Sequence, residues 1–523
     1  MINSKIACMF LLLFAFALSA QEEQGNTKKT KVYLEYADVL TFDKVRIADA
    51  QILTGDVRFR HDSSYMYCDS AYFYQSNNSL EAFSNVRMEQ GDTLFVYGDY
   101  LHYDGNTALA RLRGNVRMEN QNATLFTDSL NYDREKNIGY YFKGGFIVDE
   151  QNDLFSVFGE YSPGTKDAVF NDSVHLENPD FVLDSDTLLY NTDSKVATIL
   201  GQSIIVSDSA TVHTSRGWYD TAGKKSYLLD RSLLVSGSQF LTGDSLFFNE
   251  GEQYGEAFGN MNLTDTTRRV AMEGAYGYYH EQTKYAFATD SALFMEYSKG
   301  DTLFLHADSL MMMTTADSLR LLKAYYGVRF YRVDMQGVCD SLQFNTTDTV
   351  MHMYKEPILW NAKYQITGDT IAVYMKDSTI EYAHIHPYAF SIQEVDTAYY
   401  NQVKGQDMKA FFSGRTVDRV DVSGNVETIY FPIDDKDGEK IGMNEMQSAF
   451  LSMWIKNNKL EKLLVTGAPT ATLYPIPDLT ADKKTLKDFI WFDYLRPTDR
   501  WDIYRESKRK TKAAPHKNNK FVY

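Results

Sequence analysis

The chain has 523 residues, of which 70 are acidic and 53 basic, so its formal net charge is −17. Apolar residues make up 44% and charged residues 24%, a balance typical of folded proteins that excludes a wholly disordered chain. The acidic balance argues against a protein that follows nucleic-acid phosphates, because that function needs a basic face. Tyr and Phe are abundant, with 37 and 32 copies against only 10 Pro, and aromatic residues favour β-strands.

The first residues have the organisation of an export signal. Lys5 precedes an apolar run over residues 6–18, and Ser19 and Ala20 come before the polar Gln21. This order predicts a cleaved signal peptide over residues 1–20. The apolar run is too short to cross a hydrocarbon layer about 30 Å thick as a helix. We therefore expect an exported mature protein that is soluble or peripheral to a membrane.

An internal repeat is the strongest signal in the chain. A phrase of Asp, Ser or Thr, Leu, any residue, an aromatic residue and Asp or Asn recurs at residues 128–133, 186–191, 244–249 and 340–345. Looser copies begin at Asp69, Asp99, Asp308, Asp369 and Asp407. The array amounts to about twelve units of about 30 residues each. Cys68 and Cys339 each directly precede a repeat Asp, so they occupy equivalent places in distant units, and we predict two free thiols.

A second phrase is Gly-Asn-Val or a relative of it. It lies within segments in which apolar or small residues alternate strictly with polar or charged residues. Over residues 108–119 the even positions carry apolar or small residues, and Arg111, Arg113, Arg117 and Glu119 occupy odd positions. This period of two predicts a strand with one apolar face and one solvated face. Short clusters of turn-forming residues separate the phrases, so each unit is expected to hold two strands of about 10 residues.

The pattern lacks helical crossovers, which excludes a parallel α/β sheet and predicts an elongated all-β, antiparallel array with a continuous apolar interior. We expect strands over residues 31–475, with a break at 387, so that repeats fill 31–386 and 387–475. The widest spacing between repeats contains Pro387. Residues 476–523 are expected to form a segment that caps the last strand, followed by a basic tail, and a short helix is expected near 486–492. The edge strands are expected near 32–36 and 470–474.

These phrases together resemble the OstA-like family. The resemblance is carried by residues 55–57, 97–104, 112–119, 126–133 and 420–430, and it covers most of 45–475. The family comprises periplasmic lipopolysaccharide-transport proteins and the N-terminal domain of the outer-membrane lipopolysaccharide assembly protein. The length of the chain and its Leu495-Arg496-Pro497 segment are similar to OstA-like proteins of the Bacteroidetes.

The resemblance implies an open-ended antiparallel β-jellyroll, or β-taco, whose interior holds acyl chains. It implies a periplasmic protein that carries or bridges lipopolysaccharide to the outer membrane, with other jellyroll proteins and the outer-membrane assembly protein as partners, and no cofactor. The expected lipid contacts are the inward apolar residues, and plain core packing is the competing interpretation for each. They are Val86, Met88, Ala110, Leu112, Val116, Met118, Met261, Leu263, Val420, Val422 and Val426.

Other chemistry is poorly supported by the sequence. His384 and His386 share a strand face but have no third ligand at a helpful spacing, and residues 434–438 fail the pattern of a calcium loop. The repeat Asp and Ser or Thr have no recurring His beside them, which favours a hydrogen-bonding role over catalysis, so we expect no enzyme. Two alternatives stay open: a β-solenoid that acts on or binds polysaccharide, and a structural surface repeat with a filled core.

Overall fold

The computed structural model describes residues 30–297, 301–314, 319–376, 379–414, 416–434, 438–457 and 459–506. The chain divides into two compact units. Unit 1 consists of Met1–Leu176 and Tyr190–Asp193, and unit 2 of Glu177–Leu189 and Ser194–Tyr523. The expected signal peptide and the basic tail lie outside the described residues. Pro387 lies within unit 2, and the expected boundary there stays a prediction.

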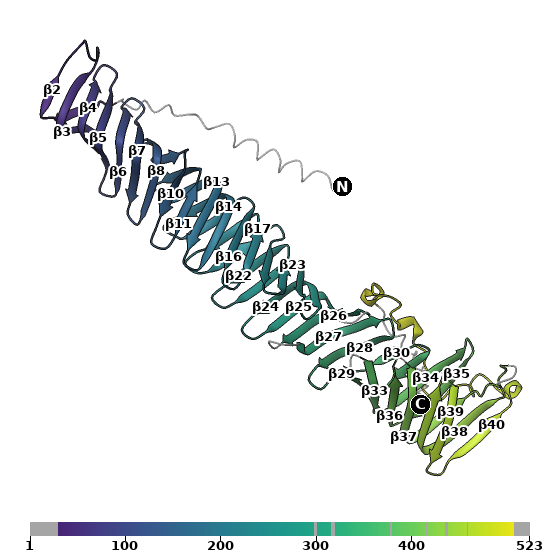
Figure 1. Cartoon of the computed structure of the whole chain (residues 1–523). Coiled ribbons are helices and arrows are strands. Elements are labelled where there is room, and N and C mark those ends of the chain that lie inside the picture. Colours follow the sequence, from purple (N-terminus) through teal and green to yellow (C-terminus); the bar gives the residue numbers. More distant parts are fainter. Residues whose placement is uncertain are drawn as a thin grey trace, which may run out of the picture. The chain divides into compact units, whose positions relative to one another are not determined.

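The prediction of an all-β, antiparallel, jellyroll-like fold is confirmed. Every strand pairing described is antiparallel, and strands such as β3 to β8 follow one another side by side in chain order (Figure 1). Among the described residues there is no α-helix, only three 3₁₀ turns. The helix expected near 486–492 is therefore wrong. Within the same described ranges, no helix has the length and apolar character needed to span a membrane.

Unit 1 contains twelve strands and most of a thirteenth. They are β1 (Tyr33–Tyr36), β2 (Val39–Thr41), β3 (Gln51–His61), β4 (Ser64–Tyr74), β5 (Ser79–Gln90), β6 (Leu94–Asp104), β7 (Leu109–Asn120), β8 (Ala123–Asp133), β9 (Ile138–Tyr141), β10 (Gly145–Val148), β11 (Asp153–Ser156), β12 (Phe158–Ser162) and β13 (Asp167–Asn178).

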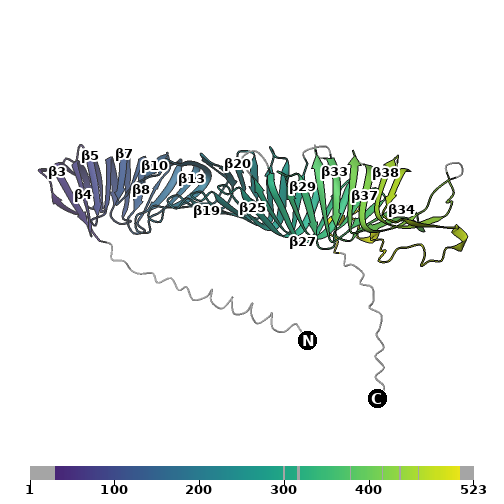
Figure 2. The same cartoon turned by 90° about the horizontal axis from the view of Figure 1, so that it is seen from below.

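Unit 2 contains most of β14 and all later elements, and Figure 2 shows its strands from below. The first half comprises β14 (Phe181–Asn191), β15 (Val196–Ile199), β16 (Ser203–Ser207), β17 (Thr211–Thr214), β18 (Gly217–Asp220), β19 (Lys225–Leu228), β20 (Leu233–Ser236), β21 (Gln239–Thr242), β22 (Ser245–Asn249), β23 (Tyr254–Asp265), β24 (Val270–His280), β25 (Tyr285–Glu296), β26 (Leu303–Thr314) and β27 (Leu319–Arg332). The second half comprises β28 (Met335–Asn345), β29 (Val350–Tyr354), β30 (Ile358–Asn361), β31 (Tyr364–Thr367), β32 (Thr370–Lys376), β33 (Thr379–His386), β34 (Ala389–Asp396), β35 (Tyr399–Gly405), β36 (Asp407–Ser413), β37 (Thr416–Tyr430), β38 (Met443–Lys456), β39 (Lys459–Thr466), β40 (Thr470–Tyr474), η1 (Ile476–Asp478), η2 (Asp493–Leu495) and η3 (Asp502–Tyr504).

The Gly-Asn phrase forms a corner in the middle of β7, β23 and β37, and its relatives Gly55-Asp56 and Ser84-Asn85 do so in β3 and β5. In β7, Gly114 and Asn115 have φ of +74° and +47°, and the pairing with β6 shifts register there. Asn115 Nδ2 donates to Oδ2 of the repeat residue Asp99 at 2.7 Å. A Cβ on Gly114 would lie 2.8 Å from the same Oδ2, so the close approach and the positive φ both favour glycine. The Asn85–Asp69 and Asn260–Asp244 bonds repeat this contact, which confirms a hydrogen-bonding role for the repeat Asp.

The corner divides each strand between two facing sheets, here called wall A and wall B. In unit 1, wall A contains residues 94–97 of β6 and 116–120 of β7, whereas wall B contains 100–104 and 109–113. Where the corner interrupts the strands completely, the halves are separate elements, so that β10 pairs with β8 in wall A and β9 pairs with β8 in wall B. Unit 2 repeats this organisation, with β21 in wall A and β22 in wall B, and both pair with β23.

The segment after β40 lies along the outer face of wall A in unit 2. We had expected it to cap the last strand, but only its first part, with Ile476 and Leu479, packs beside Tyr474 of β40. Leu495 joins Val338, Ile358 and Trp360 in one buried cluster, and Tyr504 contacts the ring of His306. Figure 1 shows this segment returning toward β26 and β30. Because β28 and β30 carry apolar residues on their outward face, they bury surface by binding the segment, while β40 stays exposed.

Candidate functional site

Opposite the corner, both walls end in turns, and in unit 1 these two ends meet. We call the ends of walls A and B lip A and lip B. Lip B carries a tyrosine at the aromatic position of successive repeats, and these tyrosines follow one another at intervals of 29 residues. Each hydroxyl lies against a polar side chain of lip A. The pairs are Tyr103–His61, Tyr132–Gln90, Tyr161–Asn120 and Tyr190–Asp149.

These tyrosine pairs close the interior of unit 1 along its side. The hydroxyl of Tyr132 donates to Gln90 Oε1 at 2.8 Å, and that of Tyr190 donates to Asp149 Oδ2 at 2.5 Å. All four tyrosines are almost fully buried. Burial raises the pKa of Tyr132 and Tyr161, so each hydroxyl keeps its proton and remains a donor at neutral pH.

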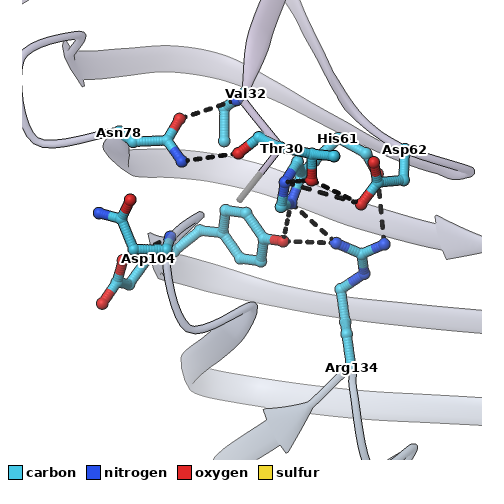
Figure 3. A network of polar contacts seen from close by, with 9 residues as sticks. Thr30, Val32, His61, Asp62, Asn78, Asp104 and Arg134 are labelled. Atoms are coloured by element: carbon cyan, nitrogen blue, oxygen red, sulfur yellow. Dashed lines mark hydrogen bonds and ion pairs between the residues drawn. The ribbon is translucent and has the colours of Figure 1, made fainter. Parts of the chain in front are cut away.

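The Tyr103 pair belongs to a larger network that holds the beginning of the described chain (Figure 3). Arg134 Nη1 lies 2.6 Å from the Tyr103 hydroxyl and 2.9 Å from His61 Nδ1, and a guanidinium only donates, so Nδ1 is the acceptor. His61 is therefore neutral, with its proton on Nε2, which donates to Thr30 Oγ1 at 2.7 Å. Burial, and then the charge of Arg134, lower the pKa of His61.

Residues 30–32 cross from one lip to the other as a strap. Thr30 contacts His61 and donates to Asp62 Oδ2 at 2.9 Å on lip A. On the other side, the backbone N–H of Val32 donates to Asn78 Oδ1 at 2.8 Å, and Asn78 Nδ2 donates to the carbonyl of Thr30 at 3.1 Å. The strap thus closes unit 1 at its first strands.

The lipid-contact residues expected from the sequence all lie in the apolar interior of their unit. All eleven are buried, and the most exposed of them, Val420, is 6% exposed. The six in unit 1 lie on β5 and β7, in a packed interior behind the tyrosine pairs. Their inward orientation follows the predicted period of two, while contact with a lipid stays a prediction.

Unit 2 keeps cross-lip contacts, such as the ion pair between Lys224 and Asp180 at 2.8 Å, and also departs from the series. Gln239 Nε2 donates to the Tyr279 hydroxyl at 3.1 Å. Phe248 occupies the aromatic position of its repeat and has no hydroxyl, and beside it lies a small apolar cavity lined by Ala210, Leu234 and Leu263. The lips here are thus held less completely than in unit 1.

At the end of unit 2 the two walls enclose an open groove with a volume of about 470 Å³. Wall B contributes aliphatic side chains from β36 to β39, among them Met408, Val420, Leu451 and Met453. Wall A contributes mixed side chains from β31 to β38, and burial raises the pKa of Tyr364 to about 12. Of the eleven expected contact residues, Val420 lines this groove.

Two buried glutamines attach the C-terminal segment to the back of wall A at this groove. Gln365 Nε2 donates to the carbonyl of Ile490 at 2.9 Å, and its Oε1 accepts from Phe492 N at 2.7 Å. Gln402 makes the same paired contact with Lys484 and Leu486, at 2.8 Å each. Both glutamine side chains point outward and are fully buried, so the segment supports wall A from outside and leaves the groove side open.

The other candidate residues form no second site. His384 Nε2 and His386 Nδ1 both approach Asp407 Oδ2, at 2.7 and 3.2 Å, but no metal-holding cluster occurs among the residues that the structure describes. Residues 435–437 of the calcium-like run lie outside the described residues. Cys68 and Cys339 are both free and buried, which confirms the predicted thiols. Burial raises the pKa of Cys68 to about 12, so this thiol is unreactive.

Comparison with known protein families matches one part of the chain. The model of the OstA-like proteins matches residues 29–186. This region is OstA-like. The resemblance is thereby confirmed over the matched residues, and the OstA-like character of later repeats stays a prediction. A comparison with curated proteins found no match.

One solved structure similar to the chain is that of LptH, described as the LptA homologous periplasmic component of the conserved lipopolysaccharide transport device from Pseudomonas aeruginosa. The identity is 13%, the match covers 20% of this chain and 79% of that chain, and the TM-score is 0.19.

The lips and the groove were not predicted from the sequence. The 29-residue spacing of Tyr103, Tyr132, Tyr161 and Tyr190 was a visible signal, as was the polar residue that ends each opposing strand. The groove had a weaker signal: aliphatic residues such as Ile455 and Leu460 stand at lip B of the last repeats, where earlier repeats carry tyrosine.

Proposed function

We propose that this protein is a periplasmic lipid-binding protein that carries or bridges lipopolysaccharide toward the outer membrane and does not catalyse a reaction. The observation that carries the proposal is the open groove between β31 and β39, whose volume of about 470 Å³ lies in the range of ligand sites. The OstA-like match of residues 29–186 supports it independently.

The groove provides the burial that acyl chains need in an aqueous compartment. Each buried methylene is worth about 0.8 kcal/mol, so one chain of about 14 carbons gains on the order of 10 kcal/mol from leaving water. Aliphatic side chains of wall B, such as Leu451, Met453 and Leu463, offer that surface.

In unit 1 the route would follow the inward apolar residues, including Val86, Met88, Val116 and Met118. These side chains are packed against one another and lie behind closed lips. A lipid that enters unit 1 must therefore separate the tyrosine pairs, which makes opening of the lips part of the proposed transport. The packed interior also favours the second candidate, in which unit 1 is a structural spacer and lipid binds only in unit 2.

We propose that partners dock at the edge strands. In unit 1, β1 and β2 pair with β3, and in unit 2, β39 and β40 pair with β38. Strands at a sheet edge offer unpaired backbone groups to another chain. Other jellyroll proteins and the outer-membrane assembly protein are the partners that this chemistry fits.

Native mass spectrometry of the protein purified from its own periplasm tests the lipid proposal. We expect a bound lipid whose mass fits a multi-chain amphiphile. Ser391→Trp places a large ring in the groove and should remove most of this lipid, whereas Gln447→Trp, on the exposed outward face of β38, should not. Protein that carries no lipid, or Ser391→Trp protein that carries the usual amount, would contradict binding in the groove.

A further inference from the structure

The lip of wall A at the groove carries a row of amide side chains, Gln393, Asn401 and Asn444, here called the amide row. All three line the groove. Gln393 and Asn401 face each other across the β34–β35 pairing, and Asn444 stands opposite Tyr430 at the start of β38. In the unit 1 repeats, the corresponding lip positions include Gln90 and Asn120, which bond to tyrosines of the opposite lip.

At the groove, the described residues of the opposite lip include no tyrosine partner for the amide row. Val417, Ile455 and Leu460 line that side, and none has a hydrogen-bonding side chain. The walls therefore lack the cross-lip bond that closes unit 1, and the amide row faces an open space whose other side is aliphatic. The groove is polar along one lip and apolar along the other.

The amide row is held in place and still has hydrogen-bonding capacity. Asn401 Oδ1 accepts from Phe431 N at 2.9 Å, and its Nδ2 donates to Gln393 Oε1 at 3.0 Å. This arrangement orients Gln393 and leaves its Nε2 as a donor. Among the residues that the structure describes, the Asn444 side chain makes no hydrogen bond, so it offers both a donor and an acceptor.

We propose that the amide row selects lipids that carry amide or hydroxyl groups at the head of the acyl chain. The row hydrogen-bonds these groups at lip A, while the chain packs against the aliphatic side chains of wall B. A plain alkyl chain displaces water from the amide side chains without replacing its hydrogen bonds. The buried amides are then left unsatisfied, which costs free energy. The inference rests on the proposed function, because it assumes that the groove binds lipid.

The test compares two lipids with the same chain of about 14 carbons. One is an N-acyl ethanolamine, and the other is the alkyl methyl ether, which lacks a hydrogen-bond donor. Each displaces a fluorescent acyl probe from the purified full-length chain. We expect the amide lipid to bind about fivefold or more tightly, which corresponds to about one hydrogen bond.

Asn444→Leu and Gln393→Met should each reduce this preference while leaving ether binding unchanged or stronger. Gln447→Leu, an exposed outward position on the same strand as Asn444, is the matched control and should keep the preference. Equal binding of both lipids to the natural protein, or an unchanged preference in both variants, would overturn the inference alone. Failure of both lipids to displace the probe would overturn the proposed function together with it.

Discussion

At the scale of single residues, position along a strand decides between core and solvent. Val116 and Arg117 are neighbours in β7, yet Val116 is 2% exposed and the Arg117 side chain 45% exposed. Arg117 lies over the ring of Tyr97 and pairs with Glu119 at 3.0 Å, so side chains on the outer face also contact one another. Alternate side chains of a strand point to opposite faces, and this property assigns most residues of the array.

Substitutions at these neighbours should differ strongly in effect. Val116→Asp places an unpaired carboxylate in the packed interior, and we expect a loss of about 3 kcal/mol or more in the free energy of unfolding. Arg117→Asp loses only the contacts with Tyr97 and Glu119, at a cost of about 1 kcal/mol. Hydrogen exchange of β7 amides in the full chain measures both, and equal sensitivity at the two positions would refute the facing assignment.

His61 predicts a pH dependence of the strap. Its pKa is lowered in the folded state, first by burial and then by Arg134, so the unfolded chain binds the proton more readily. The neutral His61 ring therefore makes its full contribution to the free energy of unfolding above the unfolded pKa of about 6.5. This contribution is lost as the pH falls below that value. Protonated Nδ1 would also face the Arg134 guanidinium, which cannot accept its hydrogen.

The backbone amide of Val32, which donates to Asn78, reports this change. We expect its hydrogen exchange, corrected for the intrinsic rate, to accelerate between about pH 6.5 and pH 5. His61→Gln removes the titrating ring, so exchange in this variant should no longer depend on pH over that range. A natural protein with pH-independent exchange at Val32 would show that His61 does not control the strap.

At the scale of elements, the same repeat is used in a closed and in an open form. In unit 1 the tyrosines of lip B bond to polar residues of lip A, as in the Tyr190–Asp149 pair. At the groove, aliphatic residues replace the tyrosines and the C-terminal segment binds the outside of wall A through Gln365 and Gln402. The closed and the open form thus differ in the residues at lip B and in the segment bound outside wall A.

Tyr190→Phe tests the closure. The variant removes a hydroxyl that bonds to the carboxylate of Asp149, and hydrogen bonds to charged groups contribute about 1.5–3 kcal/mol. We expect a loss of that size, seen as faster exchange in β10 and β11. Tyr140→Phe removes a hydroxyl from the outward face of β9 and should have little effect. Equal effects of the two variants would mean that the lip bond does not hold the walls.

At the scale of the whole molecule, the edge strands of each unit are exposed. Residues 470–473 of β40 are exposed, and so is Tyr33 of β1 at 53%. We had expected the segment after residue 475 to cap the last strand, which would have left the N-terminal edge as the freer one. Since this segment binds the outer face of wall A instead, both edges are available for pairing.

Photoreactive residues at Tyr33 and Thr472 should therefore both crosslink to envelope proteins in living cells. The control is Lys225 in β19, because this strand is paired on both sides and offers no free edge. A crosslink that forms equally well from Lys225 would show adhesion unrelated to strand edges. If Tyr33 and Thr472 both failed to crosslink, docking by edge pairing would be refuted.

The sequence by itself determined what depends on neighbouring residues in the chain. The strands, their inward faces, the free thiols and the bonding of the repeat Asp at each corner follow from a period of two and from local turn chemistry. The tertiary structure decided what depends on the distance between walls. Whether Tyr103 meets His61, whether Leu460 leaves a groove open, and which face Leu495 covers are set by packing between distant segments, which no local pattern encodes.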